Sequence, residues 1–160
     1  MRYVPSARDD QDAPLYAGPT LYPTAKILIV EDNLELAQYM STLLSPLCRT
    51  EIAADGEIGL QSIRVEAPTL VISDRMMPNR DGLSLCREVR AHSETRDIPF
   101  VLLTALTYRN ALLEGWEAGA DDYLFKPFHP DELVTRVRAL VAARLNVLEQ
   151  SDARRAAGRE

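Results

Sequence analysis

The chain has 160 residues, 46% of them hydrophobic, with a formal net charge of -6 and a pI near 5.0. A chain of this length can bury one sizeable core and has little left for a second, so we expect one domain with tails. The negative charge argues against a general nucleic-acid binder and against a partner membrane of anionic lipid. The longest apolar runs also fall short of the ~18 residues that a membrane-spanning helix needs.

The two cysteines, Cys48 and Cys86, lie far apart and show neither C-x-x-C nor Cys/His spacing. The spacing therefore predicts no zinc site and no disulfide framework, and it fits a reducing compartment. We interpret both as buried structural thiols. The N-terminus lacks a basic start followed by an apolar stretch, so we expect a cytoplasmic protein without a secretion signal.

Residues 1–24 mix Pro, Gly, Asp and scattered aromatics without a helical or strand period, which predicts a flexible leader. Tyr16, Leu21 and Tyr22 are its candidates for docking on the body of the protein. From residue 26 onward, short apolar runs alternate with segments of helical spacing. The expected strands are 26–30, 49–53, 69–73, 99–103 and 122–125, and the expected helices are 33–45, 56–66, 82–91, 109–118 and 131–149.

This alternation predicts an α/β domain, with five parallel strands joined by right-handed crossovers and five helices covering both faces of a doubly wound sheet. No Gly-rich phosphate-binding loop follows the first strand, so neither dinucleotide nor nucleoside-triphosphate binding is predicted. We expect the domain to occupy residues 25–145. Residues 146–160 would then form an extension of the last helix and a polar tail that frays.

Polar side chains follow four of the expected strands. In an open parallel sheet the chemistry lies just beyond the carboxyl ends of the strands. Taken singly, each of these polar side chains has a structural explanation as a helix cap, a turn residue or a solvated charge. Together they predict a Mg²⁺ site, because clustered carboxylates repel one another unless a cation intervenes and carboxylate oxygens suit that ion. The residues are Glu31, Asp32, Asp74, Thr104 and Lys126.

The motifs ILIVEDN, ISDRMMPNRDG, LLTAL and GADDYLFKPF resemble, in the same order, the receiver domains of bacterial two-component response regulators. The resemblance covers about residues 25–145 and implies a flavodoxin-like sheet of order 2-1-3-4-5. It implies that Asp74 accepts a phosphoryl group from a phospho-histidine of a sensor histidine kinase or phosphotransfer protein, with Mg²⁺ as the cofactor. Asp32 and Asp74 would bind the ion directly, Glu31 through a water molecule and Met76 through its backbone carbonyl.

The same resemblance implies that Thr104 and Lys126 contact the phosphoryl group and that Thr104 and Tyr123 form the switch. Phosphorylation would change the surface formed by the helix at 109–118, the strand at 122–125 and the last helix. That surface would bind a downstream protein or a second copy of the chain, without direct contact to nucleic acid or membrane. Such a protein catalyses its own phosphotransfer and slow autodephosphorylation, and is no turnover enzyme for external substrates.

Two other functions stay open at this point. A pseudo-receiver would act as a constitutive interaction module. A phosphatase of the haloacid-dehalogenase kind would need a second Asp two residues after the nucleophile, where this chain has Met76. We assign His92 to a loop and His129 to a helix start, and neither to phosphotransfer. Arg80 is interpreted as a solvated loop charge.

Two further expectations concern the surroundings of Asp74. The Lys126-Pro127 peptide bond is predicted to be cis, as in the receivers that the chain resembles, although only about 5–6% of X-Pro bonds are. Met76 and Leu106, two residues past Asp74 and Thr104, are apolar, so we expect them to exclude water and slow autodephosphorylation.

Overall fold

A computed structural model describes the backbone of residues 19–105 and 109–158, together with their side chains except those of 109–112. Five strands and five helices alternate along it, and the strand order is β2-β1-β3-β4-β5 with every pair parallel. The predicted doubly wound fold is therefore confirmed. The strands are β1 (Lys26–Val30), β2 (Arg49–Ala53), β3 (Leu70–Asp74), β4 (Phe100–Thr104) and β5 (Asp122–Phe125). The helices are α1 (Leu34–Leu44), α2 (Gly56–Val65), α3 (Gly82–Ala91), α4 (Arg109–Ala118) and α5 (Pro130–Ala157).

Strands β3 and β4 end one residue later than the sequence pattern predicts. The backbone N–H of Arg75 donates to the carbonyl oxygen of Leu103 at 2.9 Å, and that of Lys126 donates to Thr104 at 2.8 Å. These bonds carry the parallel ladder through the last residue of each strand. Asp74 and Thr104 are thus strand residues whose backbone is fixed by the sheet.

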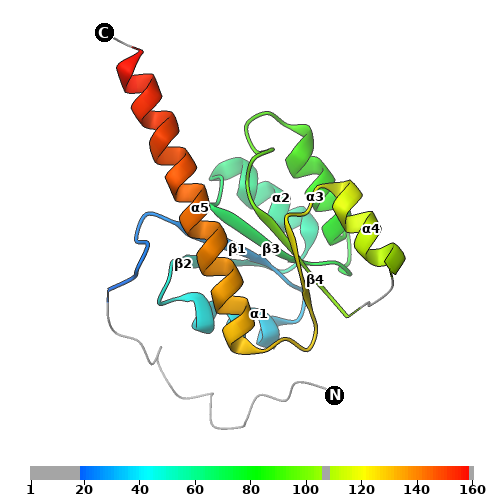
Figure 1. Cartoon of the computed structure of the whole chain (residues 1–160). Helices are drawn as coiled ribbons and strands as arrows, with labels where there is room; N and C mark the ends of the chain where they lie inside the picture. Colours follow the sequence, from blue (N-terminus) through cyan, green and yellow to red (C-terminus); the bar gives the residue numbers. More distant parts are fainter. Residues whose placement is uncertain (1–18, 106–108, 159–160) are drawn as a thin grey trace.

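Helix α5 is longer than the predicted 131–149, and the residues expected to fray as a polar tail are helical through Ala157. Residues 150–157 read QSDARRAA, in which Ala and Arg are good helix formers, and no Gly or Pro occurs before the C-cap Gly158. The last turns of α5 project beyond the sheet (Figure 1).

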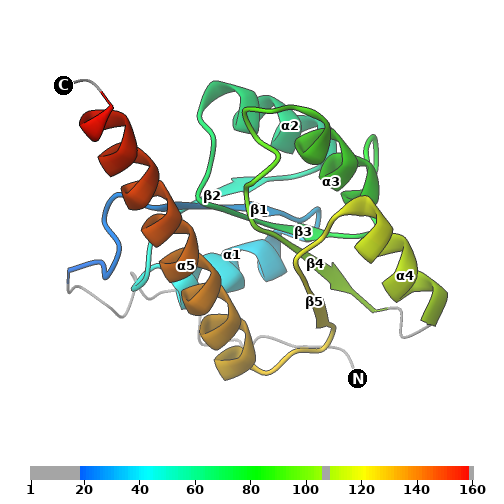
Figure 2. The same ribbon diagram turned by 45° about the horizontal axis from the view of Figure 1, so that its top comes forward.

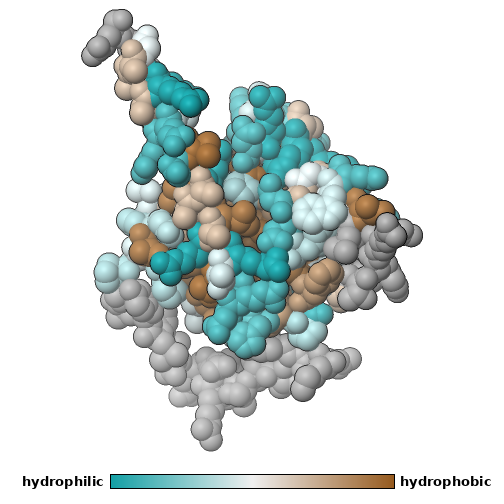
Figure 3. Space-filling view, viewed as in Figure 1, coloured by the Kyte–Doolittle hydropathy of each residue, from teal (hydrophilic) through white to brown (hydrophobic). Residues whose placement is uncertain are grey.

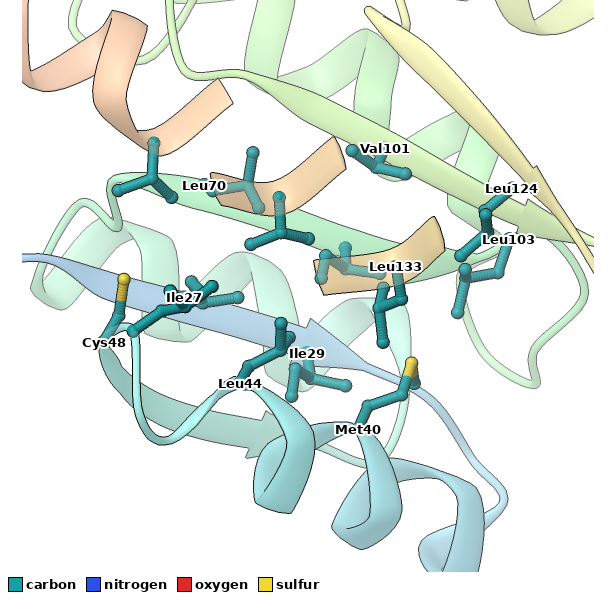
Figure 4. Close-up of a cluster of buried hydrophobic side chains, with 14 of the residues drawn as sticks. Ile27, Ile29, Met40, Leu44, Cys48, Leu70, Val101, Leu103, Leu124 and Leu133 are labelled. Carbon is teal, nitrogen blue, oxygen red and sulfur yellow. The ribbon is translucent and has the colours of Figure 1, made fainter. Parts of the chain in front are cut away.

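Helices α1 and α5 cover one face of the sheet, and α2, α3 and α4 cover the other (Figures 1 and 2). Successive strand residues point to opposite faces, so each face has its own buried cluster. Figure 4 shows the first, where Ile27 and Ile29 of β1 meet Leu44 of α1 and Leu133 of α5. Burial on both faces explains why β1, β3 and β4 read as almost continuous apolar runs.

The two cysteines are buried and free, Cys48 in the first cluster and Cys86 in the second. Burial raises the pKa of each thiol to about 11, so neither is a reactive thiolate at neutral pH. The interpretation of both as structural thiols agrees with this environment.

The expected docking of the leader is confirmed for Tyr22, which packs against the first cluster and donates from its backbone to Leu47 at 2.7 Å. Leu21 bonds to Pro46 through its backbone, but its side chain is exposed. Tyr16 lies outside the described residues. No helix in the described part of the chain is long and apolar enough to cross a membrane.

The start of α3 lies directly on the backbone of β3. Asp81 caps the helix by accepting from the N–H of Ser84 at 2.7 Å, and Gly82 N–H donates to the carbonyl of Arg75 at 2.9 Å. A Cβ atom on Gly82 would lie 2.2 Å from the carbonyl oxygen of Asp74, closer than any real contact. This close approach fixes the end of β3.

We expect Gly82→Ala to lower the free energy of unfolding by about 2 kcal/mol, because the added methyl group must push α3 away from Asp74. Urea denaturation monitored by circular dichroism measures the change. Gly158→Ala is the matched control, since a Cβ there makes only ordinary contacts of 3.4 Å or more. Equal stability of Gly82→Ala and the wild type would contradict the close approach.

Candidate metal and phosphoryl site

Three carboxylates meet at the carboxyl edge of the sheet. Glu31 and Asp32 directly follow β1, and Asp74 is the last residue of β3. One oxygen from each lies within 4.8 Å of the others; Glu31 and Asp74 are buried, while Asp32 is exposed. Hard oxygen ligands with one solvent-facing side are what a partly hydrated Mg²⁺ requires. The donor set therefore fits the ion that the sequence predicted.

Lys126, which follows β5, reaches the same cluster. Its ammonium nitrogen lies 3.1 Å from Oδ2 of Asp74 and 3.3 Å from both carboxylate oxygens of Glu31. The Lys126-Pro127 peptide bond is cis, as predicted. One cation cannot neutralise three carboxylates, so the cluster keeps a surplus of negative charge that favours a further cation.

The surroundings of this cluster also change the pKa of Glu31. Burial and the neighbouring Asp74 carboxylate raise the pKa of Glu31 to about 7, although the Lys126 ammonium acts in the opposite direction. Near neutral pH this carboxyl group therefore exchanges between its protonated and ionised forms. A bound metal ion would have to displace that proton.

The predicted switch residues lie on the two strands beyond β3. Thr104 ends β4 and is buried, with Phe125 of β5 as its partner in register. Tyr123 of β5 is also buried, and its ring centre lies 5.3 Å from that of Trp116 on α4 in an edge-to-face arrangement. Both side chains belong to the sheet face that α4 covers.

The loop after Asp74 is held by side-chain contacts to α2. Asn79 adopts a left-handed backbone with φ of 68°, and its side chain donates to Asp55 at 2.8 Å. The interpretation of Arg80 as a solvated charge is wrong. Its guanidinium lies 2.9 Å from Glu57 and also donates to Ser84 at 3.0 Å. The ion-pair partner Glu57 lies 23 positions away, so the sequence alone gave no sign of this pair.

Several other predicted positions can be placed. Met76 is 67% exposed, and its backbone N–H lies 3.5 Å from Oδ1 of Asp74, at the limit of a hydrogen bond. Leu106 lies outside the described residues. His92 is the C-cap of α3, and His129 is the N-cap of α5, the helix start predicted for it. Arg75, which the sequence analysis passed over, forms an ion pair with Glu114 of α4.

Comparison with known proteins identifies the family of the chain. Residues 27–138 match the family described as the response regulator receiver domain. The chain belongs to this family. The DNA-binding response regulator MtrA of Mycobacterium tuberculosis is 42% identical over 115 residues, covering 71% of this chain and 49% of MtrA. MtrA of Mycolicibacterium paratuberculosis gives the same identity over 71% of this chain and 50% of its own length.

Solved receiver domains share the fold. The receiver domain of Francisella response regulator 1452 has a TM-score of 0.69 at 34% identity, covering 74% of this chain and 98% of that one. The receiver domain of the sensor histidine kinase PA1611 of Pseudomonas aeruginosa has a TM-score of 0.68 at 31% identity with the same coverage. That structure holds a magnesium ion coordinated in its active-site cleft. The present receiver spans about half the length of the curated relatives it matches.

We expect the affinity for Mg²⁺ to rise with pH up to about 7, because a proton on Glu31 competes with the ion. Below that value the affinity should change by at most about tenfold per pH unit, the limit for one displaced proton. Isothermal titration with Mg²⁺ across this range measures the slope. Glu31→Gln, which has no such proton to lose, should flatten it, and an equally steep slope in that variant would contradict the assignment.

Proposed function

We propose that this receiver is a phosphorylation-activated signalling switch, in which Asp74 accepts a phosphoryl group from a phospho-histidine of a sensor histidine kinase or phosphotransfer protein. The observation that carries the proposal is the position of Asp74, held at 3.1 Å from the Lys126 ammonium within the three-carboxylate cluster. Its carboxylate is fixed by the sheet and lies at the edge where a donor can approach.

In the proposed step, a carboxylate oxygen of Asp74 forms a new O–P bond while the N–P bond of the phospho-histidine breaks. The electron pair of that bond stays with the imidazole, which takes up a proton. Lys126 contributes an ammonium that neutralises charge on the transferring phosphoryl oxygens, and Thr104 contributes a hydroxyl group as hydrogen-bond donor. Both groups act by position and charge, which is how most phosphoryl transfer is catalysed.

For the metal, we propose Asp32 and Asp74 as direct ligands, Glu31 as a ligand through water and the backbone carbonyl of Met76 as the last protein ligand. Mg²⁺ bound there would neutralise charge on the phosphoryl oxygens. The carboxylate oxygens within 4.8 Å of one another support the assignments of Asp32, Asp74 and Glu31, and the assignment of Met76 rests on membership of the receiver family.

The proposed output is a change in the surface formed by α4, β5 and α5, which would bind a downstream protein or a second copy of the chain. Leu113, Trp116 and Phe125 are exposed on α4 and β5. On the face shown in Figure 3, apolar and weakly polar side chains interrupt the hydrophilic surface over α4. Exposed aromatic and aliphatic side chains of this kind are typical of binding surfaces.

We place this function in the cytoplasm and assign it to a unit of residues 25–145, with 146–160 as an extension.

Direct contact with nucleic acid is not part of the proposal, because the net charge of the chain is -6. The two MtrA relatives are described as DNA-binding, and this chain matches only about half of their length. The absence of nucleic-acid binding therefore stays a prediction, testable by gel shift.

Incubation with a small acyl phosphate and Mg²⁺ should add one phosphoryl group to the wild type, measured as intact mass. Asp74→Asn should take up none, because an amide cannot form the acyl phosphate, and excess chelator should abolish labelling of the wild type. Asp81→Asn is the control, since Asp81 caps α3 and lies outside the cluster. Labelling of Asp74→Asn equal to that of the wild type would contradict the proposal. No labelling of any variant would favour the pseudo-receiver alternative.

The phosphorylated state should be long-lived, because Met76, two residues past Asp74, is apolar, and its exposed side chain offers no group that could hold an attacking water. We expect Met76→Asn, alone or with Leu106→Glu, to speed phosphate release by about tenfold, since a polar group there can hold the attacking water. Release of inorganic phosphate from the labelled protein is the measurement. Equal rates in wild type and variants would show that water exclusion does not set the lifetime.

A further inference from the structure

Arg75 connects the phospho-acceptor strand to α4. Its neighbour Asp74 lies on the face of the first cluster, two residues after the buried Ile72, so the side chain of Arg75 points to the opposite face, under α4. There the guanidinium forms an ion pair with Glu114 of α4. The side chain of Arg75 is only 12% exposed, so this pair is screened less than a surface pair.

The backbone of Arg75 cannot move independently of Asp74. Its N–H donates to Leu103 at 2.9 Å and its carbonyl accepts from Gly82 at 2.9 Å. The Nε–H of Arg75 is buried and has no hydrogen-bond partner among the described residues. A buried donor on a charged group is costly to leave unpaired, so a new acceptor nearby would attract it.

Next to Glu114, the chain has Gly115, and this glycine determines where Tyr123 can lie. A Cβ atom on Gly115 would fall 1.1 Å from the hydroxyl oxygen of Tyr123. Any larger residue would therefore expel the ring from beneath α4. Trp116, the next residue, packs against the same ring at a centroid distance of 5.3 Å.

We propose that Arg75 is the positioning residue that couples Asp74 to the switch, by seating α4 so that the backbone of Gly115 lies over the Tyr123 hydroxyl group. This inference rests on the proposed function. A phosphoryl group adds a charge of about -1.5 to -2 one residue from Arg75 and brings new acceptor oxygens. That charge draws the guanidinium away from Glu114, and α4 and Tyr123 then lose the contact that holds them in this packing.

Trp116 makes the inference testable, because it is the single tryptophan of the chain and lies on α4. In the wild type, beryllofluoride with Mg²⁺ should change the fluorescence of Trp116. Arg75→Met and Glu114→Gln should still bind beryllofluoride, measured by ¹⁹F NMR, but should lose most of the fluorescence change. Glu114 is half exposed, so Glu114→Gln should fold even if Arg75→Met does not.

Arg80→Gln is the matched control, since Arg80 lies in the same loop but pairs with Glu57 of α2. It should keep the full fluorescence change. Gly115→Ala should give a Trp116 signal that no longer depends on beryllofluoride, because Tyr123 cannot return beneath α4. A full response in Glu114→Gln, or no response in a wild type that binds beryllofluoride, would overturn the coupling. Failure of the wild type to bind beryllofluoride would instead count against the proposed function.

Discussion

Repulsion among three carboxylates at one edge of the sheet is the constraint on which the rest of this receiver depends. The apolar clusters on both faces supply the stability that allows Glu31 and Asp74 to be buried together. Lys126 offsets part of the repulsion, while burial and the neighbouring Asp74 carboxylate together raise the pKa of Glu31. The clustered negative charge favours binding of a cation. A phosphoryl group, which brings both charge and acceptor oxygens, would then change the electrostatic interactions of the neighbouring side chains.

The surrounding structure fixes the position of Asp74 at the edge of the sheet. Gly82 lets α3 begin in contact with the Asp74 carbonyl, and Asn79 in a left-handed conformation bonds to the cap of α2. The loop therefore has contacts to two helices, while the Asp74 carboxylate faces the open edge. On the other face, Arg75 reaches α4. In the proposed function, Asp74 at the end of β3 would carry the chemistry and the following residue, Arg75, would reach the output helix, because successive side chains point to opposite faces.

Much of this arrangement could be predicted from the sequence. Apolar runs located all five strands within one residue, and the alternation with helical segments gave the parallel sheet and hence the edge where Glu31, Asp74 and Lys126 meet. The full length of α5 was missed, because the side chains of its last turns are mostly polar and exposed, so they carry no hydrophobic period. The ion pairs of Arg80 with Glu57 and of Arg75 with Glu114 were missed because the partners are distant in sequence, and only the folded chain brings them together.

The central claim is that the carboxylate of one residue, Asp74, carries the phosphoryl group. Borohydride reduction converts an aspartyl phosphate to homoserine, so peptide mapping after treatment with acyl phosphate, Mg²⁺ and borohydride locates the modified residue directly. Our account predicts homoserine at position 74 and at neither Asp32 nor Glu31, whose carboxylates lie in the same cluster. Modification of Asp32, or a phosphorylated protein in which Asp74 remains intact, would contradict it.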